Sequence, residues 1–173
     1  MKKLLIASAI AALTSAAFAA SNPATTQFDV LLKVVSACTV SSGTNVDFGS
    51  VDSTAAAALT ANANAITVTC SKGTKYTIGL TPSNSNTTGA GVMKSATAPT
   101  TQTDTVAYQL RSAAGTGGAV WGNTNTSGTV VGNGVSGTGT GVAINHMVYA
   151  TVADATTATP DNYKDTVQVT VRY

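Results

Sequence analysis

The amino-acid sequence predicts an all-β fold, a sandwich of short antiparallel strands. Val, Thr and other β-branched residues alternate with polar residues in several short runs. Clusters of Gly, Asn, Ser and Pro, which are typical of turns, separate these runs. Because no stretch has the periodicity of a long helix, the chain is expected to bury its apolar faces by packing sheet on sheet.

The first residues have the pattern of a secretory signal peptide, residues 1–19. Lys2 and Lys3 precede an apolar run, and Ala17-Phe18-Ala19 supplies an Ala-x-Ala cleavage site. The apolar run is shorter than the ~20 residues that span a bilayer. We therefore expect an exported mature chain of residues 20–173, a length that fits one domain. An uncleaved membrane anchor is the alternative.

The charges indicate neither a nucleic-acid partner nor an anionic membrane. The chain has 9 Lys and Arg residues against 7 acidic residues, all of them aspartate. Without Lys2 and Lys3 the net charge is about zero, and the remaining cations do not cluster.

Residues 25–40 are predicted to form the first strand. Phe28, Val30, Leu32 and Val34 share one face, whereas Gln27, Asp29 and Lys33 lie opposite. Leu31 and Val35 make the second face partly apolar. A strand this near the start of an exported chain either folds back into its own domain or pairs with another molecule.

The middle of the chain predicts further strands of the same kind. Inward-facing sets are expected at Ile66, Val68 and Cys70, at Tyr76, Ile78 and Leu80, and at Val106, Tyr108 and Leu110 or the set opposite. A short strand over 117–122 carries the single tryptophan, and a longer one covers 142–153. Residues 54–64 are expected to be a helical turn or a surface loop, and the Gly/Thr/Asn-rich residues 123–141 a loop.

The last residues have the clearest alternation in the chain. Val167, Val169, Val171 and Tyr173 point one way, and Thr166, Gln168, Thr170 and Arg172 point the other. This pattern predicts a strand with one face in the core.

Cys38 and Cys70 are the only cysteines. An even number of cysteines in an exported chain favours a disulfide, which would stabilise the fold by about 3–4 kcal/mol in the chain-entropy model. A zinc or redox pair lacks the required spacing and companion ligands.

No motif indicates catalysis, a cofactor or a metal. His146, the single histidine, has no nucleophile or carboxylate in a recognisable local pattern and is expected to be structural or on the surface. Gly132, Gly134 and Gly137 fit GxGxxG, but the residues that follow cannot open a helix. Asp47 and Asp52 lack the spacing of a calcium loop. We therefore expect no enzyme, no small-molecule substrate, no cofactor and no metal.

Taken together, the chain resembles the spore coat protein U domain family, the fold of archaic (Csu-type) chaperone–usher pilins. The resemblance covers nearly the whole mature chain. It rests on "CTV" at Cys38, "VDFG" at Val46, "VTCSKGTKYTIGL" at Val68, "AYQL" at Ala107, "VWG" at Val120, "VYATV" at Val148 and, most specifically, "PDNYKDTVQVTVRY" at Pro160.

The resemblance implies an incomplete immunoglobulin-like β-sandwich, residues 36–173, that is completed by donor-strand complementation. Residues 20–35 would be the donor extension, with Phe28, Val30, Leu32 and Val34 inserting into a neighbouring subunit. The strand carrying Val167, Val169, Val171 and Tyr173 would form the edge of the acceptor groove and pair with a periplasmic chaperone. The implied partners are neighbouring pilin subunits, this chaperone and an outer-membrane usher. The implied location is an extracellular pilus, reached through the periplasm, that supports surface attachment and biofilm formation.

Three alternatives remain at this point. A small outer-membrane β-barrel would need about eight strands of 9–11 residues and aromatic girdles, for which the chain is too poor in aromatic residues. A self-contained secreted binding module would use residues 25–40 to complete its own sandwich. Within the family, the chain could be a spore-coat component or a minor or tip adhesive subunit.

Overall fold

A computed structural model describes residues 22–54, 59–97, 101 and 103–173. The predicted signal peptide, residues 1–19, lies outside these residues. By contacts between Cα atoms the chain divides into Met1–Val34 and Val35–Tyr173, and each unit is described by itself. No helix occurs in the described residues, and accordingly none there is long and apolar enough to cross a membrane.

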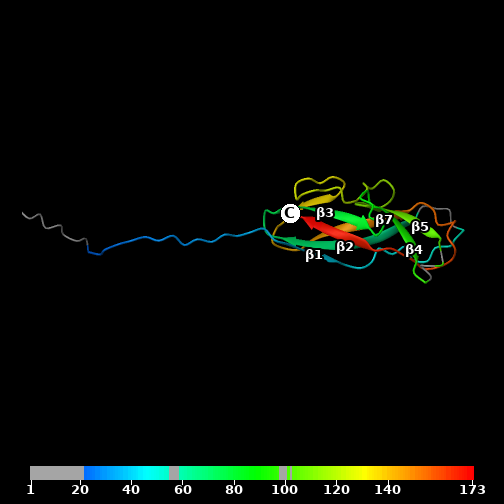
Figure 1. Cartoon of the computed structure of the whole chain (residues 1–173), viewed down its shortest axis with the longest axis horizontal. Coiled ribbons are helices and arrows are strands. Elements are labelled where there is room, and N and C mark those ends of the chain that lie inside the picture. The colour runs from blue at the N-terminus through cyan, green and yellow to red at the C-terminus, as the bar shows by residue number, and fades with distance from the viewer. Residues whose placement is uncertain (1–21, 55–58, 98–100, 102) are drawn as a thin grey trace, which may run out of the picture. The chain divides into compact units, whose positions relative to one another are not determined.

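The described part of Val35–Tyr173 contains two antiparallel sheets (Figure 1). The larger sheet has the strand order β1-β2-β7-β5-β4-β8 and the smaller has the order β6-β3-β9. The strands are β1 (Cys38–Ser42), β2 (Leu59–Cys70), β3 (Lys75–Pro82), β4 (Ala90–Ser95), β5 (Thr105–Arg111), β6 (Val135–Thr138), β7 (Ile144–Val152), β8 (Tyr163–Lys164) and β9 (Val167–Arg172). The predicted all-β sandwich is confirmed.

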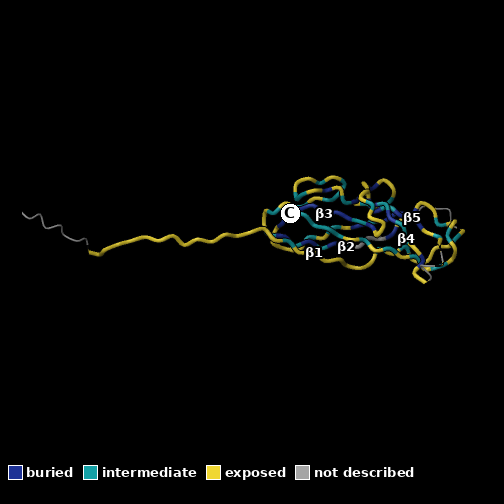
Figure 2. Tube along the Cα trace, in the orientation of Figure 1, coloured by how far each residue is buried: buried dark blue, intermediate teal, exposed yellow. Residues whose placement is uncertain are grey.

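One hydrophobic core joins the two sheets (Figure 2). The three inward-facing sets predicted for β2, β3 and β5 are all buried, which also settles the choice of face on β5. Trp121 is 1% exposed, and its indole Nε1 donates a hydrogen bond to the backbone oxygen of Ile78 at 2.9 Å. The core is therefore built by side chains from both sheets, as alternation on half-buried strands requires.

Several predicted loops are strands, and one predicted strand is not. β2 begins at Leu59, so residues 59–64 extend the strand instead of forming a turn or loop. β4 was not predicted, and β6 lies within the Gly/Thr/Asn-rich stretch that was predicted to be a loop. Residues 117–122 contribute only an isolated bridge between Val120 and Arg111.

The stretch 123–141 covers the outer face of β3. Asn125 is buried, and its Nδ2 donates to Thr77 Oγ1 at 2.7 Å, while Asn123 Nδ2 donates to Thr81 Oγ1 at 2.7 Å. β6 then pairs with one edge of β3. Gly137 is required there because a Cβ would lie 2.3 Å from the ring of Tyr76. Both the outer face of β3 and the edge opposite β9 are thereby occupied.

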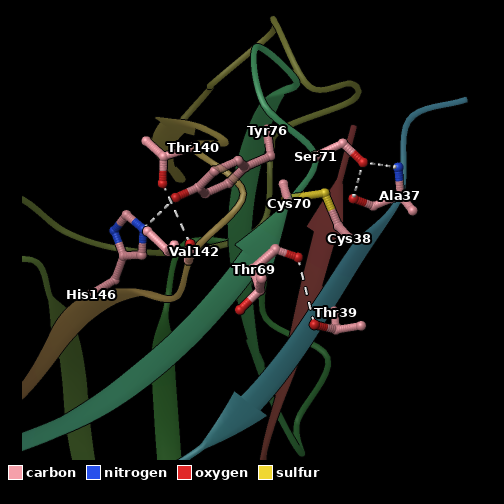
Figure 3. Close-up of a disulfide and its surroundings, with 10 residues drawn as sticks. All are labelled: Ala37, Cys38, Thr39, Thr69, Cys70, Ser71, Tyr76, Thr140, Val142 and His146. Atoms are coloured by element: carbon pink, nitrogen blue, oxygen red, sulfur yellow. Dashed lines mark hydrogen bonds between the residues drawn. A yellow bond between two sulfur atoms is a disulfide. The ribbon is translucent and has the colours of Figure 1, made fainter. Parts of the chain in front are cut away.

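The predicted disulfide joins Cys38 to Cys70 (Figure 3). The two residues are direct partners in the β1–β2 register and close a loop with a sequence separation of 32. Ser71 reinforces the same corner, since its backbone N–H donates to Ala37 O at 2.9 Å and its Oγ accepts from Ala37 N at 3.1 Å. β1, the first strand of the folded unit, is thus cross-linked to β2 at its first residue.

Beside the disulfide, His146 contacts a buried tyrosine. Its Nε2 lies 2.8 Å from Tyr76 Oη, and the two rings pack edge to face (Figure 3). Burial lowers the pKa of His146 below its usual 6.5 and raises the pKa of Tyr76. The imidazole therefore stays neutral and shares a hydrogen bond with the phenol, which agrees with the structural role predicted for His146.

This pair makes stability depend on pH in a defined window. In the unfolded chain His146 takes up its proton near pH 6.5, and in the folded chain only at a lower pH. The free energy of unfolding should thus change little between about pH 7 and 9, below the ordinary tyrosine pKa of about 10, and fall as the pH drops from 6.5 towards 5. Hydrogen bonds lower the pKa of Asp52, Asp104, Asp154 and Asp161 below 3.8 in the folded chain. Their contributions to stability are lost at lower pH than that of His146, because unfolded carboxyl groups take up protons only as the pH approaches 3.8.

Denaturant unfolding at a series of pH values measures this effect. His146→Gln keeps a hydrogen-bonding side chain but does not titrate, so its stability should be flat between pH 7 and 5. An equal decline in both proteins would show that His146 is not responsible.

Candidate functional site

A groove of about 690 Å³ opens into the core of the folded unit. The larger sheet contributes Ile66, Leu110 and Val148, and the smaller sheet contributes Leu80 from β3. These four side chains are at most 4% exposed, although they line the groove. The groove therefore leads to the hydrophobic interior rather than to a surface depression.

The walls of the groove come from segments far apart in the sequence. One wall is β9, through Val167 and Val169. Other lining residues are Ser42 at the end of β1 and the half-buried Val46 and Phe48 that follow it. Residues from the first and last strands of the folded unit thus line the same groove.

β9 is an edge strand. Its register pairs Val167 through Arg172 with β3, and within the described residues no strand pairs with its other side. β9 alternates: Val167, Val169 and Val171 pack against the core, and the residues between them face outward. An edge strand carries a row of backbone N–H and C=O groups that another strand can pair with.

The chain changes sheets directly before β9. β8 pairs with β4 in the larger sheet, whereas β9 belongs to the smaller one. Asp165 lies at the crossover, and its Oδ2 accepts a hydrogen bond from Tyr108 Oη at 2.7 Å. Burial, and then this hydrogen bond, raise the pKa of Tyr108, so the phenol keeps its proton and continues to donate. These contacts fix the entry of β9 beside the groove.

The predicted edge residues occupy different places in this site. Val167 and Val169 line the groove, whereas Val171 packs against the core outside the lining. Tyr173 follows the end of β9 and is 58% exposed. The sequence did not predict that the groove is also lined by Phe48, Met93 and Tyr108. These residues lie in different parts of the chain, and only the fold brings them together.

The predicted first strand differs from the structure. Only Cys38–Ser42 is a strand, and residues 24–37 do not adopt strand conformation. Phe28, Val30, Leu32 and Val34 are between 81% and 87% exposed, and Leu31 is 88% exposed (Figure 2). The alternation gives this segment the side chains of a strand, but a strand also needs a partner for its backbone.

The sequence profile of the family described as Spore Coat Protein U domain matches residues 24–170. The chain belongs to this family. The match confirms the resemblance inferred from the sequence. It begins at Ala24 in the N-terminal segment and ends within β9, so it covers most of the chain of this spore coat protein U domain protein.

Among solved structures, one that the domain resembles is the chaperone–tip adhesion subunit pre-assembly complex from the archaic chaperone–usher Csu pili of Acinetobacter baumannii. The identity is 22% and the TM-score 0.47. The match covers 81% of this chain and 40% of that chain, so the domain spans less than half the length of that chain. No curated protein sequence matches the domain significantly.

The groove has the chemistry of a strand-binding site. Its lining combines aliphatic and aromatic side chains with the polar residues of the β8–β9 crossover. In the part of the chain that the structure describes, no group of three or more His, Cys, Asp or Glu side chains is arranged to hold a metal ion. What the site offers is an apolar cleft beside an unpaired strand edge, which is the arrangement that β-augmentation uses.

Proposed function

We propose that this spore coat protein U domain is the structural subunit of an extracellular chaperone–usher pilus and polymerises by donor-strand exchange. The observation that carries the proposal is the groove beside the free edge of β9, which reaches the fully buried core residues of both sheets. A segment rich in alternating apolar residues is available in the same chain to fill the groove of a second copy.

The N-terminal segment has the side chains that such a role needs. Phe28, Val30, Leu32 and Val34 form a row on one face and are exposed. Burial of each is worth ~1.5–3 kcal/mol, which gives the row a gross ~6–12 kcal/mol before ordering costs. Backbone hydrogen bonds to the edge of β9 would also fix which residue of the segment lies opposite which residue of β9.

β9 is the edge best suited to accept the segment. The other edge strands are shorter, since β1 has 5 residues, β6 has 4 and β8 has 2, whereas β9 has 6. Among these edges, β9 also carries two apolar side chains of the groove wall. A donor that adds to β9 therefore gains both backbone hydrogen bonds and apolar burial.

The same groove implies the partners of the unassembled subunit. An open apolar cleft beside an unpaired strand edge promotes aggregation, so a periplasmic chaperone would fill it first. At an outer-membrane usher, the N-terminal segment of the next subunit would then replace the chaperone. The finished filament would lie outside the cell and support surface attachment and biofilm formation.

Electron microscopy of material sheared from expressing cells tests the proposal. Cells producing the full chain should yield filaments, and a chain lacking residues 20–35 behind an intact signal peptide should yield none. The deleted chain should still accumulate with its chaperone in the periplasm, because the folded unit and its groove are unchanged. Filaments from the deleted chain would overturn the proposal.

A further inference from the structure

Asn133 holds separate segments of the folded unit together through one side chain. Its Oδ1 accepts hydrogen bonds from the backbone N–H and the Oγ1 of Thr124, at 2.9 Å and 2.8 Å, and its Nδ2 donates to Thr87 O at 2.9 Å. The backbone of Asn133 adds two more, since its N–H donates to Thr124 Oγ1 at 2.9 Å and its oxygen accepts from Gly122 N at 3.0 Å. Asn133 thus connects the stretch 123–141 to the loop between β3 and β4.

The residue that follows Asn133 has to be glycine. A Cβ on Gly134 would lie 2.6 Å from the backbone oxygen of Ile78 in β3, and such an overlap can be relieved only by moving the backbone. Asn133–Gly134 is also the only Asn-Gly dipeptide in the sequence. The contacts of the two residues therefore require, at this one place in the fold, a dipeptide that is chemically labile.

An asparagine followed by glycine deamidates spontaneously in a flexible chain. The backbone nitrogen of the glycine attacks Cγ of the asparagine, the Cγ–Nδ2 bond breaks, and Nδ2 leaves as ammonia with the proton of the attacking nitrogen. Water then opens the resulting cyclic imide to aspartate or to isoaspartate. Glycine favours the attack because it has no Cβ and reaches backbone conformations that are closed to other residues. The reaction needs only water, and its product carries a new negative charge.

The folded unit holds both reacting groups away from this reaction. The backbone nitrogen of Gly134 donates to Val131 O at 2.8 Å. The side-chain amide of Asn133 is fixed by its hydrogen bonds to Thr124 and Thr87, and Cγ can come into bonding contact with Gly134 N only if the side chain rotates out of them. Deamidation therefore requires a local opening of the stretch 123–141, and its rate is set by the fraction of molecules that are open.

We propose that Asn133 is a site of spontaneous deamidation, which the folded unit keeps closed and which becomes reactive when the stretch 123–141 opens or the chain unfolds. A carboxylate at this position cannot donate to Thr87 O, and it places a negative charge beside that backbone oxygen. Isoaspartate also lengthens the backbone by a methylene group. Either product loses the bond to the β3–β4 loop, so a molecule that has reacted closes less well than before and the damage accumulates. The inference does not depend on the proposed function, because it concerns the folded unit alone.

Peptide mapping by mass spectrometry measures deamidation at Asn133 in the full chain. Wild-type protein is kept in mildly alkaline buffer, either in its folded form as isolated from cells or in guanidinium with a reductant. We expect Asn133 to react at least about tenfold faster in the unfolded sample, a factor equivalent to ~1.4 kcal/mol of opening free energy. Equal rates in the two samples would overturn the inference.

Two threonine variants separate the hydrogen bonds of Asn133 from the rest of the fold. Thr124→Val keeps the shape of the side chain but removes both contacts of Oγ1 with Asn133, and in folded protein it should raise the rate about fivefold. Thr126→Val makes the same chemical change at an exposed position of the same stretch and should leave the rate unaltered. In guanidinium the variants and the wild type should react alike.

A folded Thr124→Val chain that reacts no faster than Thr126→Val would also overturn the inference. The comparison of folded with unfolded wild type needs no variant and decides the question by itself if Thr124→Val does not fold. Neither experiment reads polymerisation, so the proposed function stands or fails separately, on the chain that lacks residues 20–35.

Discussion

Leu32→Asp should abolish polymerisation while leaving the folded unit intact. In the proposed complex Leu32 belongs to the apolar row that enters the groove, whose lining includes Val169. The substitution loses ~1.5–3 kcal/mol of burial and adds the cost of desolvating a carboxylate, which is several kcal/mol. A total of at least ~4 kcal/mol lowers the affinity of one subunit for the next by about a thousandfold or more.

The neighbouring leucine supplies a matched control. Leu31 is as exposed as Leu32 in the single chain, at 88% against 87%, but it faces the other side of the segment. Leu31→Asp makes the same chemical change on the outer face and should still form filaments. Negative-stain microscopy and the yield of sheared subunit report both variants, and their chaperone-bound forms should be equally soluble. Filaments of normal length from Leu32→Asp would refute the assignment of the donor face.

Removing the disulfide should lower the stability of the folded unit by about 3–4 kcal/mol. The bridge closes a loop with a sequence separation of 32, and its main effect in the chain-entropy model is to restrict the unfolded chain. Cys38 lies at the start of β1, directly after the exposed segment, so β1 should detach from β2 more readily when Cys38→Ala and Cys70→Ala are combined.

Guanidinium unfolding of assembled protein, followed by circular dichroism, measures this loss. Wild-type protein treated with a reductant gives a second comparison in which no side chain is replaced. Agreement between the two would attribute the loss to the bridge itself. A change below about 1 kcal/mol in both would show that β1 is held by its hydrogen bonds to β2 and by the contacts of Ser71 instead.

Period-two alternation predicted the strands whose two faces differ most. β9 alternates valines with polar residues, and β2 and β3 carry their buried sets at the expected positions. The local signal and the tertiary environment agree in these strands, so the residues alone determine which face is buried. The cysteine count predicted the disulfide in the same way, because only one pairing of two cysteines exists.

Strands that depend on glycine could not be predicted. Gly91 in β4 and Gly137 in β6 leave room for the rings of Tyr108 and Tyr76, since a Cβ would come within 2.1 Å and 2.3 Å of them. Glycine is unfavourable in strands on average, and only the packed ring explains its presence. The groove was missed in part for a related reason: Phe48, Met93 and Tyr108 converge there from separate elements, and no local pattern marks that convergence.

The segment over residues 25–37 shows the opposite relation between sequence and structure. Its alternation is as clear as that of several true strands, yet in the structure it does not adopt strand conformation, and its apolar side chains are exposed. Strand-forming side chains without a strand partner are costly to keep in water, unless the partner belongs to another molecule.

The central claim is that the groove beside β9 is filled by another copy of the chain. A side-chain-resolution electron cryomicroscopy structure of filaments from wild-type cells tests it most directly. We expect Phe28, Val30, Leu32 and Val34 of each subunit in the groove of its neighbour, hydrogen-bonded to β9, with the chain traced continuously between subunits. Density that traces these residues into the groove of their own molecule, leaving subunits joined through other surfaces, would contradict the account.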